Sequence, residues 1–146
     1  MNAQQMWDAF AAREPQAAGH PFEAWAYGDA PDELAALTLR GVKRATSSAH
    51  ALYAAEGEPL PQTGAYSVIL NGREEAVCVI RTTAVTIVPY CRVSAAFAAM
   101  EGEGDRSLEH WRKVHESFFT RELARAGLLF TQDTPVVCEE FEVVYK

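Results

Sequence analysis

The chain has 146 residues, of which 49% are hydrophobic and 23% are charged, and its formal net charge is −7. This length and composition suit one folded globular domain over residues 1–146 and argue against disorder. The acidic balance argues against a general nucleic-acid coat, because non-specific binding depends mainly on Lys and Arg. We therefore expect a small or single-stranded ligand, and no binding to DNA.

The N-terminus and the cysteines indicate a cytoplasmic protein. Residues 1–10 include Asp8 and lack the apolar core of a signal peptide. No apolar run reaches the ~18–20 residues that a membrane helix needs, so no membrane partner is expected. Cys78, Cys91 and Cys138 are widely spaced and match neither a zinc pair nor a redox motif, so we expect reduced thiols.

The first half of the chain is predicted to be mainly helical. Apolar residues at helical spacing indicate a first helix over residues 2–14. Residues 19–31 mix aromatic residues with Gly and Pro and are expected to be irregular. A second helix is expected over 32–41, with Asp32 as its N-cap. A third helical piece is expected over 46–57, capped by a hydroxyl residue near its start.

The second half of the chain alternates strands with one long helix. β-branched and aromatic residues predict strands at about 65–70 and 75–88, with a hairpin dipeptide Asn-Gly at 71–72. Apolar residues at 3,4 spacing predict a helix over 108–127, and alternation predicts a closing strand over 134–146. This order favours an α+β fold, with a small, mostly antiparallel sheet or barrel flanked by helices.

Basic and hydroxyl residues meet in the segment "RGVKRAT". A glycine stop with basic residues at a helix end explains the pattern without any function. Alternatively, burial of Lys43 would make it a base, and Thr46 three residues later would be its nucleophile. A third reading makes Lys43 and Arg44 an anion site beside a helix N-terminus. Spacing alone leaves these alternatives open.

Acidic residues alternate with glycine in "EGEGDRS". Asp105 or Ser107 suits the N-cap of the long helix, whereas Glu101 and Glu103 precede the cap and gain less from it. Paired acids suit general acid–base work or a divalent metal. No histidine joins them at a recognised metal spacing, so we expect acid–base work without a cofactor and keep a divalent metal as the alternative.

Aromatic residues and histidines give weaker signals. His115 and Trp111 lie on the apolar stripe of the long helix and are expected to be core residues. Trp25 and Tyr27 read more readily as core, although the aromatic density around them also suits stacking on single-stranded bases.

Three stretches together resemble the ASCH domain family of small PUA-like domains. They are "GVKRATSS", the strand region from "GAYSVIL" to "TIVPY", and "EGEGDRSLEHWRKVHESFF". The resemblance covers about Phe22 to Tyr145, and Gly41, Lys43 and Thr46 match the family's GxKxxT motif. It implies a β-barrel core flanked by helices, a cleft beside GxKxxT, and a link to RNA or nucleoside chemistry.

The resemblance also implies two activities. Members similar to this chain include a ribonuclease acting on single-stranded RNA, which we rank first. Shorter relatives include an amidohydrolase that removes the acetyl group from N4-acetylcytidine with a lysine, a threonine and a glutamate. These catalytic groups carry over to Lys43, Thr46 and Glu103, with Glu101 as the rival acid. A non-catalytic RNA-binding module is a third alternative.

Either activity predicts single-stranded RNA or a modified nucleoside as the partner. Aromatic side chains would stack on bases, and arginines would contact phosphates. The candidate substrate-binding residues are Trp25, Tyr27, Arg44, Ser47, Arg81, Glu101 and Arg112.

Overall fold

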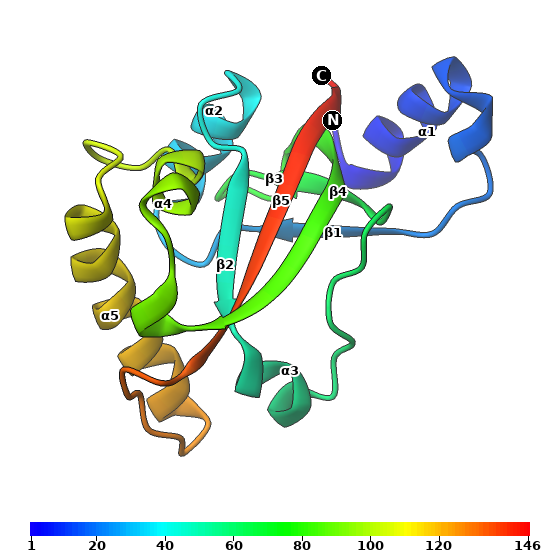
Figure 1. Ribbon diagram of the computed structural model, residues 1–146. Coiled ribbons are helices and arrows are strands. Elements are labelled where there is room, and N and C mark those ends of the chain that lie inside the picture. The colour runs from blue at the N-terminus through cyan, green and yellow to red at the C-terminus, as the bar shows by residue number, and fades with distance from the viewer.

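A computed structural model describes all residues from 1 to 146, and its centre is one curled five-stranded sheet (Figure 1). The strand order is β1-β3-β4-β5-β2. The strands are β1 (Phe22–Ala26), β2 (Ala45–Ala49), β3 (Tyr66–Leu70), β4 (Ala76–Pro89) and β5 (Pro135–Tyr145). Strands β1 and β3 pair in parallel, and the other pairs are antiparallel. The sheet forms a half-barrel, because its edge strands β1 and β2 do not pair.

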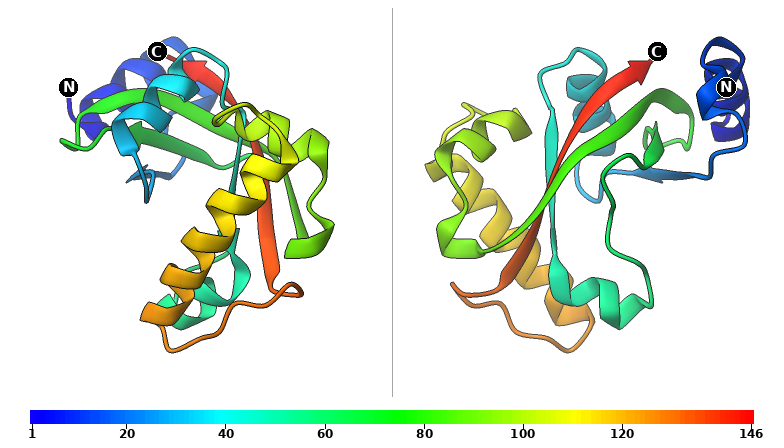
Figure 2. Two further views of the ribbon diagram at one scale, coloured as in Figure 1. Left: turned by 90° about the vertical axis from the view of Figure 1, so that its left-hand side faces the viewer. Right: turned by 45° about the vertical axis from the view of Figure 1, so that its right-hand side comes forward.

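Five helices surround this sheet, as the further views show (Figure 2). They are α1 (Ala3–Arg13), α2 (Pro31–Leu39), α3 (His50–Glu56), α4 (Ala95–Glu101) and α5 (Leu108–Arg125), with short 3₁₀ turns at Pro15–Ala17 and Tyr90–Arg92. Helices α1 and α2 pack on β3 and β4, while α4 and α5 lie along β2. The predicted α+β class with a mostly antiparallel sheet is confirmed. None of the helices combines the length and apolarity of a membrane span.

Alternation along β3 explains how the sheet carries helices on both faces. Val68 packs with Trp7 and Phe10 of α1, whereas its neighbour Ile69 packs with Ala35 of α2. Successive side chains of a strand point to opposite faces, so two adjacent residues anchor two helices. A third apolar cluster, which includes Phe119, joins α5 to β2 and to the first half of β5.

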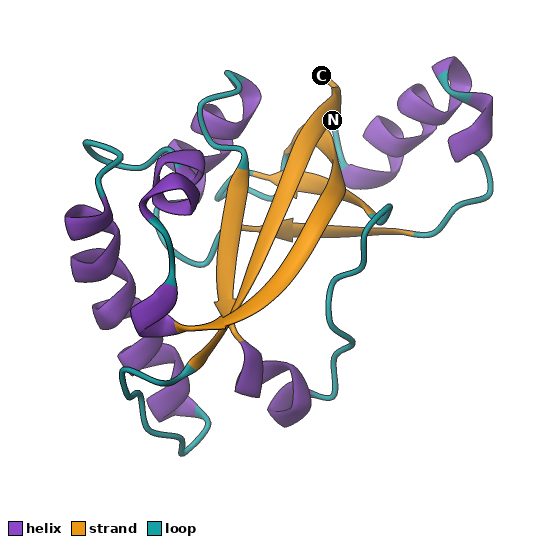
Figure 3. Ribbon diagram, in the orientation of Figure 1, coloured by secondary structure: helices purple, strands orange, loops and turns teal.

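The predicted strands β3, β4 and β5 and the helices α1 and α5 are present (Figure 3). Ser107 caps α5 as expected, and its hydroxyl accepts a hydrogen bond from the backbone N–H of His110. The Asn-Gly dipeptide does not form a two-residue turn. The backbone N–H of Asn71 instead bonds to the carbonyl of Glu75, which makes a wider loop with Glu74 at positive φ.

Three predictions for the first half of the chain were wrong. The segment expected to be irregular contains β1, which gains its strand conformation by pairing with β3. The expected start of the third helix is β2, because these residues pair with β5, and α3 begins only at His50. Asp32 does not cap α2, whose N-cap is Ala30; its carboxylate accepts a hydrogen bond from the Gly72 N–H at 2.8 Å.

Candidate functional site

Lys43 lies in the tight turn that connects α2 to β2. The backbone N–H groups of Val42 and Lys43 both donate to the carbonyl of Leu37, which ends α2 and turns the chain sharply. The next residue, Arg44, donates its backbone N–H to the carbonyl of Met100 at 2.7 Å. This bond joins the Lys43 turn to the end of α4, so the lysine is positioned by two segments that are distant in sequence.

Gly102 lets the acidic segment approach the lysine turn closely. It ends α4 with a φ of 72°, in the left-handed region that favours glycine. A Cβ atom at this position would lie 2.5 Å from the carbonyl oxygen of Val42. Only glycine fits this contact, which brings Glu101 and Glu103 on either side of it to Lys43.

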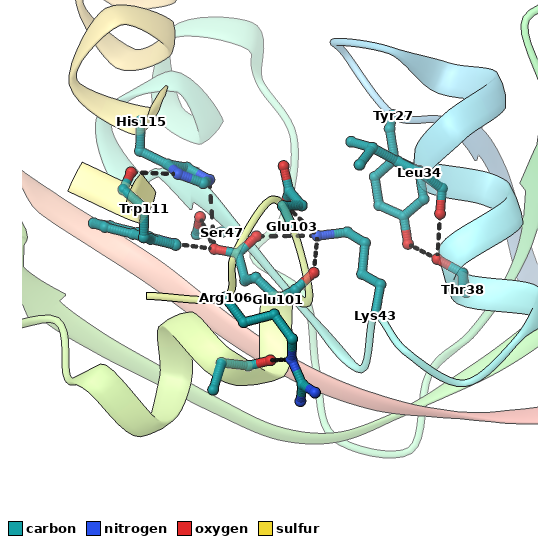
Figure 4. A network of polar contacts seen from close by, with 11 residues as sticks. Tyr27, Leu34, Thr38, Lys43, Ser47, Glu101, Glu103, Arg106, Trp111 and His115 are labelled. Atoms are coloured by element: carbon teal, nitrogen blue, oxygen red, sulfur yellow. Dashed lines mark hydrogen bonds and ion pairs between the residues drawn. The ribbon is translucent and has the colours of Figure 1, made fainter. Parts of the chain in front are cut away.

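The amine of Lys43 is held between these two carboxylates (Figure 4). Lys43 Nζ lies 3.1 Å from Glu101 Oε1 and 2.9 Å from Glu103 Oε2. The exposed fraction of the side chain is 1% for Lys43, 2% for Glu101 and 19% for Glu103. The ring of Tyr27 closes another side, 5.2 Å from Nζ. Of the two acids, Glu103 is therefore the one that a ligand can reach.

The second oxygen of Glu101 is held by three further donors. Its Oε2 accepts hydrogen bonds from the hydroxyl of Ser47, at 2.7 Å, and from the indole N–H of Trp111, and it lies 3.4 Å from His115 Nε2. Burial alone would raise the pKa of Glu101, but the Lys43 ammonium and the bonds from His115 and Trp111 outweigh it and hold the pKa well below its usual range. Glu101 is thus a fixed anion that orients the lysine.

His115 belongs to this network, although its position on an apolar stripe predicted only a core residue. Its Nδ1 lies 2.9 Å from the carbonyl of Trp111, one helical turn earlier. Burial opposes protonation of His115, yet its bond to Glu101 and the charges of Glu101 and Glu103 raise its pKa overall. The i, i+4 spacing of Trp111 and His115, directly after the acidic segment, is the sequence signal for this arrangement.

A cavity of about 1000 Å³ opens beside the Lys43 cluster, inside the half-barrel. Eight carboxylates line it, against a single lysine, Lys43. The acidic lining residues are Glu23, Asp29, Glu56, Glu58, Glu101, Glu103, Glu122 and Glu139. Trp25, Tyr27, Tyr53, Tyr66 and Phe118 supply aromatic walls. The cavity therefore offers apolar ring surfaces in a strongly negative field.

Most of the predicted site residues face this cavity. Lys43, Ser47, Glu101 and Glu103 form one bonded cluster. Thr46 lines the cavity on β2, but the hydrogen bonds of Lys43 Nζ go to the two glutamates and none goes to Thr46.

The two predicted stacking residues also line the cavity. The rings of Trp25 and Tyr27 meet edge to face at 5.1 Å, and Tyr27 is fixed through its hydroxyl to Thr38. A flat ligand ring therefore meets aromatic surface at this wall.

The three arginines predicted to contact phosphate do not line the cavity. Arg44 and Arg112 are exposed, and neither is among the lining residues. Arg81 is also outside the lining, and its guanidinium lies 3.7 Å from Glu142 across the strand pair β4–β5. Their role in binding stays a prediction.

Family membership follows from the sequence and from solved structures. Residues 23–145 match the ASCH domain family. The chain belongs to the ASCH domain family. An ASCH domain from Lactobacillus crispatus JV V101 has 37% sequence identity and a TM-score of 0.91, covering 98% of this chain and 94% of its own. The family is generally linked to RNA binding.

Two further structures resemble this ASCH chain. Protein EF3133 from Enterococcus faecalis V583 has 35% identity and a TM-score of 0.87, and the match covers 99% of this chain and 88% of that one. The hypothetical protein PH0355 has 15% identity and a TM-score of 0.56, over 84% of this chain and 98% of that one, and shares the fold alone. No curated protein matches the chain.

The ASCH site brings together donor groups of the kind that bind metals. Ligand atoms of Glu101, Glu103 and His115 lie within 4.8 Å of one another. However, the ammonium of Lys43 already bridges the two carboxylates, and Glu101 Oε2 accepts from Ser47 and Trp111. A metal ion would have to displace the lysine, so the arrangement fits a lysine-neutralised acid pair better than a metal centre.

Proposed function

We propose that this ASCH protein hydrolyses an amide bond on an uncharged nucleoside, of the N4-acetylcytidine type. The observation that carries the proposal is the contact between Lys43 and the accessible Glu103 at the wall of an acidic, aromatic cavity. The flat base of a nucleoside can stack on the aromatic walls, and a nucleoside carries no charged phosphate. This reverses the order expected from sequence, in which a ribonuclease came first.

Charge is the reason for preferring an uncharged substrate. Phosphoryl chemistry relies on cations that stabilise charge on the phosphate oxygens. The one lysine in the cavity is paired with two carboxylates, and the other lining carboxylates repel anions. An amide carbonyl develops a single oxyanion, which one lysine can stabilise.

The two glutamates are assigned different roles because their exposure differs. Glu101 is buried, fully bonded and kept ionised, so it positions Lys43 and does not exchange protons with substrate. Glu103 bonds to Lys43 at 2.9 Å and faces the cavity, so it is assigned as the acid–base group.

The reaction is proposed to proceed through an ester on Thr46. Lys43 first passes a proton to Glu103, and the neutral amine then accepts the hydroxyl proton of Thr46. Thr46 Oγ attacks the amide carbonyl, and Glu103 protonates the leaving nitrogen as the C–N bond breaks. Water, deprotonated by Glu103, then attacks the ester, and Thr46 Oγ leaves with a proton returned by Lys43 as the acid is released. Glu103 then passes its proton back to Lys43. Lys43 bonds only to glutamates in the structure, so this step requires its amine to form a new hydrogen bond to Thr46.

A ribonuclease acting on single-stranded RNA is the second candidate. The general link of ASCH domains to RNA binding supports it, and exposed Arg44 and Arg112 would meet phosphates outside the cavity. In that case Glu103 would be the base for the ribose 2′-hydroxyl, and the Lys43 amine would stabilise the phosphate.

One assay separates these activities. Purified protein is incubated with N4-acetylcytidine and, separately, with single-stranded RNA, and acetate, cytidine and RNA fragments are measured. Lys43→Ala and Glu103→Gln are expected to lose at least about 100-fold in rate, as general acid–base groups contribute 10²–10⁴-fold. Exposed Lys113→Ala and Glu109→Gln on α5 serve as charge-matched controls.

Each outcome points to a different function. Free acetate from wild type, lost in both site variants, supports the proposal. RNA cleavage with intact N4-acetylcytidine would favour the ribonuclease. If both substrates survive, a non-catalytic binding module is the better account, and its RNA affinity should fall as salt rises.

A further inference from the structure

A row of polar side chains crosses the sheet along the floor of the cavity. Thr46 on β2 is the register partner of Glu139 on β5, so the two side chains lie side by side on one face. Glu139 Oε2 accepts a hydrogen bond at 2.7 Å from the hydroxyl of Thr82 on β4. Ser67 follows on β3, the next strand of the sheet, and all four residues line the cavity.

Two groups in this row are buried but incompletely bonded. Ser67 is only 6% exposed, yet its hydroxyl has no hydrogen-bond partner in the protein. Glu139 is 9% exposed, and only one of its two oxygens is bonded, to Thr82. No fully buried polar side-chain atom lacks a partner, so both free groups face the cavity. Both groups can therefore form hydrogen bonds with a molecule that enters the cavity, although most of each residue is buried.

The length of this row across the sheet also suits an extended small molecule. Neighbouring strands lie ~4.8 Å apart, so the three steps from β2 to β3 span roughly 14 Å along the sheet. Thr46 stands at the reacting end of this row, beside the Lys43 cluster, and Ser67 stands at the opposite end. A ligand that reacts at Thr46 therefore passes over Glu139 before it reaches Ser67.

We propose that this row binds a nucleoside lengthwise, with the base on Glu139 and the ribose on Ser67. Glu139 accepts a hydrogen bond from the exocyclic N4–H of the base, which in N4-acetylcytidine is the N–H of the reacting amide, as carboxylates accept from the N4 amino group of cytosine. The Ser67 hydroxyl bonds to a sugar hydroxyl. The assignment rests on the proposed function only in placing the reacting amide at Thr46.

The surroundings of Glu139 suit a hydrogen-bond donor rather than an anion. Burial in the sheet raises the pKa of its carboxyl, and the charge of Glu23 adds to this effect, while the Thr82 hydroxyl works against it. No lysine or arginine bonds to Glu139. Its free oxygen is thus available to a neutral hydrogen-bond donor.

Binding measurements test the row without any turnover. The affinities of cytidine and of the free base cytosine are measured by calorimetry for wild type, Ser67→Ala and Glu139→Leu. Loss of one hydrogen bond corresponds to roughly 2- to 10-fold in affinity. Ser67→Ala is expected to weaken cytidine by this factor and to leave cytosine unchanged, whereas Glu139→Leu weakens both. Exposed Ser117→Ala and Glu142→Leu are the matched controls.

The outcomes separate this inference from the proposed function. Equal effects of Ser67→Ala on cytidine and cytosine would overturn it, as would wild type that binds neither molecule. A Glu139→Leu variant that binds both as wild type does would also overturn it. If the variants behave as expected but N4-acetylcytidine is not hydrolysed, the proposed function fails and the nucleoside row stands.

Discussion

Two buried glutamates of the same cavity, Glu101 and Glu139, have pKa values that are shifted in opposite directions. The pKa of Glu101 falls below its usual range, although burial alone would raise it, because Lys43, Trp111 and His115 bond to it. The pKa of Glu139 rises, because burial acts on it with only the Thr82 hydroxyl in opposition. Partners, not burial, thus decide which glutamate is a fixed anion and which can adapt to a ligand.

Replacing Lys43, the cation that distinguishes Glu101 from Glu139, should have the largest effect on stability. Lys43→Ala leaves the Glu101 carboxylate buried without its ion-pair partner, so it is expected to destabilise the fold by about 3–5 kcal/mol. Urea unfolding of the variant and of exposed Lys113→Ala measures the difference. A loss similar to that of the control would mean that Glu101 does not depend on Lys43.

Disturbing the close contact at Gly102, beside the Lys43 cluster, should have the next largest effect on stability. Gly102 and Gly57 both end helices at positive φ, and alanine there costs about 1–2 kcal/mol in each case. Only at Gly102 does the added Cβ meet backbone, 2.5 Å from Val42 O, whereas nothing lies within 4 Å at Gly57. Gly102→Ala is therefore expected to be worse than Gly57→Ala by roughly 1–3 kcal/mol. Equal thermal stabilities of the two variants would contradict this close contact.

The pH dependence of stability should differ in sign between the two glutamates. The folded pKa of Glu101 lies below the unfolded value of ~4.3, so its contribution is present above that pH and is lost as pH falls through the folded pKa. The folded pKa of Glu139 lies above the unfolded value, so its penalty grows as pH rises through that interval.

Unfolding free energies of Glu101→Gln and Glu139→Gln, measured against wild type at each pH, test these signs. The stability advantage of wild type over Glu101→Gln should shrink in acid. Its advantage over Glu139→Gln should shrink as pH rises from about 4. Parallel curves for the two variants would mean that the two sites do not differ.

The smallest effect is expected at the partner of Glu139. Thr82→Val keeps the shape of the side chain but removes one hydrogen bond, which corresponds to about 0.5–1.5 kcal/mol. The pKa of Glu139 should rise further, since the Thr82 hydroxyl lowers it. NMR titration of the carboxyl, with exposed Thr83→Val as control, measures this change. An unchanged titration would show that the bond is absent in solution.

Local sequence signals were sufficient for part of the fold. Strong β-propensity identified β3 and β4, and apolar spacing identified α5. Strand β2 was missed because "ATSSA" has low β-propensity and becomes a strand only through its pairing with β5, about ninety residues later. Helix α4 was not expected either, since its two turns carry little periodic signal.

The candidate site was predictable where a motif marked it. The GxKxxT motif and the acidic segment identified Lys43, Glu101 and Glu103, and the fold places them in contact. His115 lies in the quoted family stretch but was expected to be a core residue, and Glu139 carries no such mark. Only the packing of α5 on β2 and of β5 between β2 and β4 brings them to the cavity.

The bond between Lys43 and Glu101 has a consequence for how the protein folds. It joins residues 58 positions apart, and Glu101 receives its remaining donors from β2 and α5. Closing such a loop is entropically unfavourable until other contacts have formed. We therefore expect the charged groups to stay hydrated until both segments have docked, so that completion of the site is among the last steps of folding.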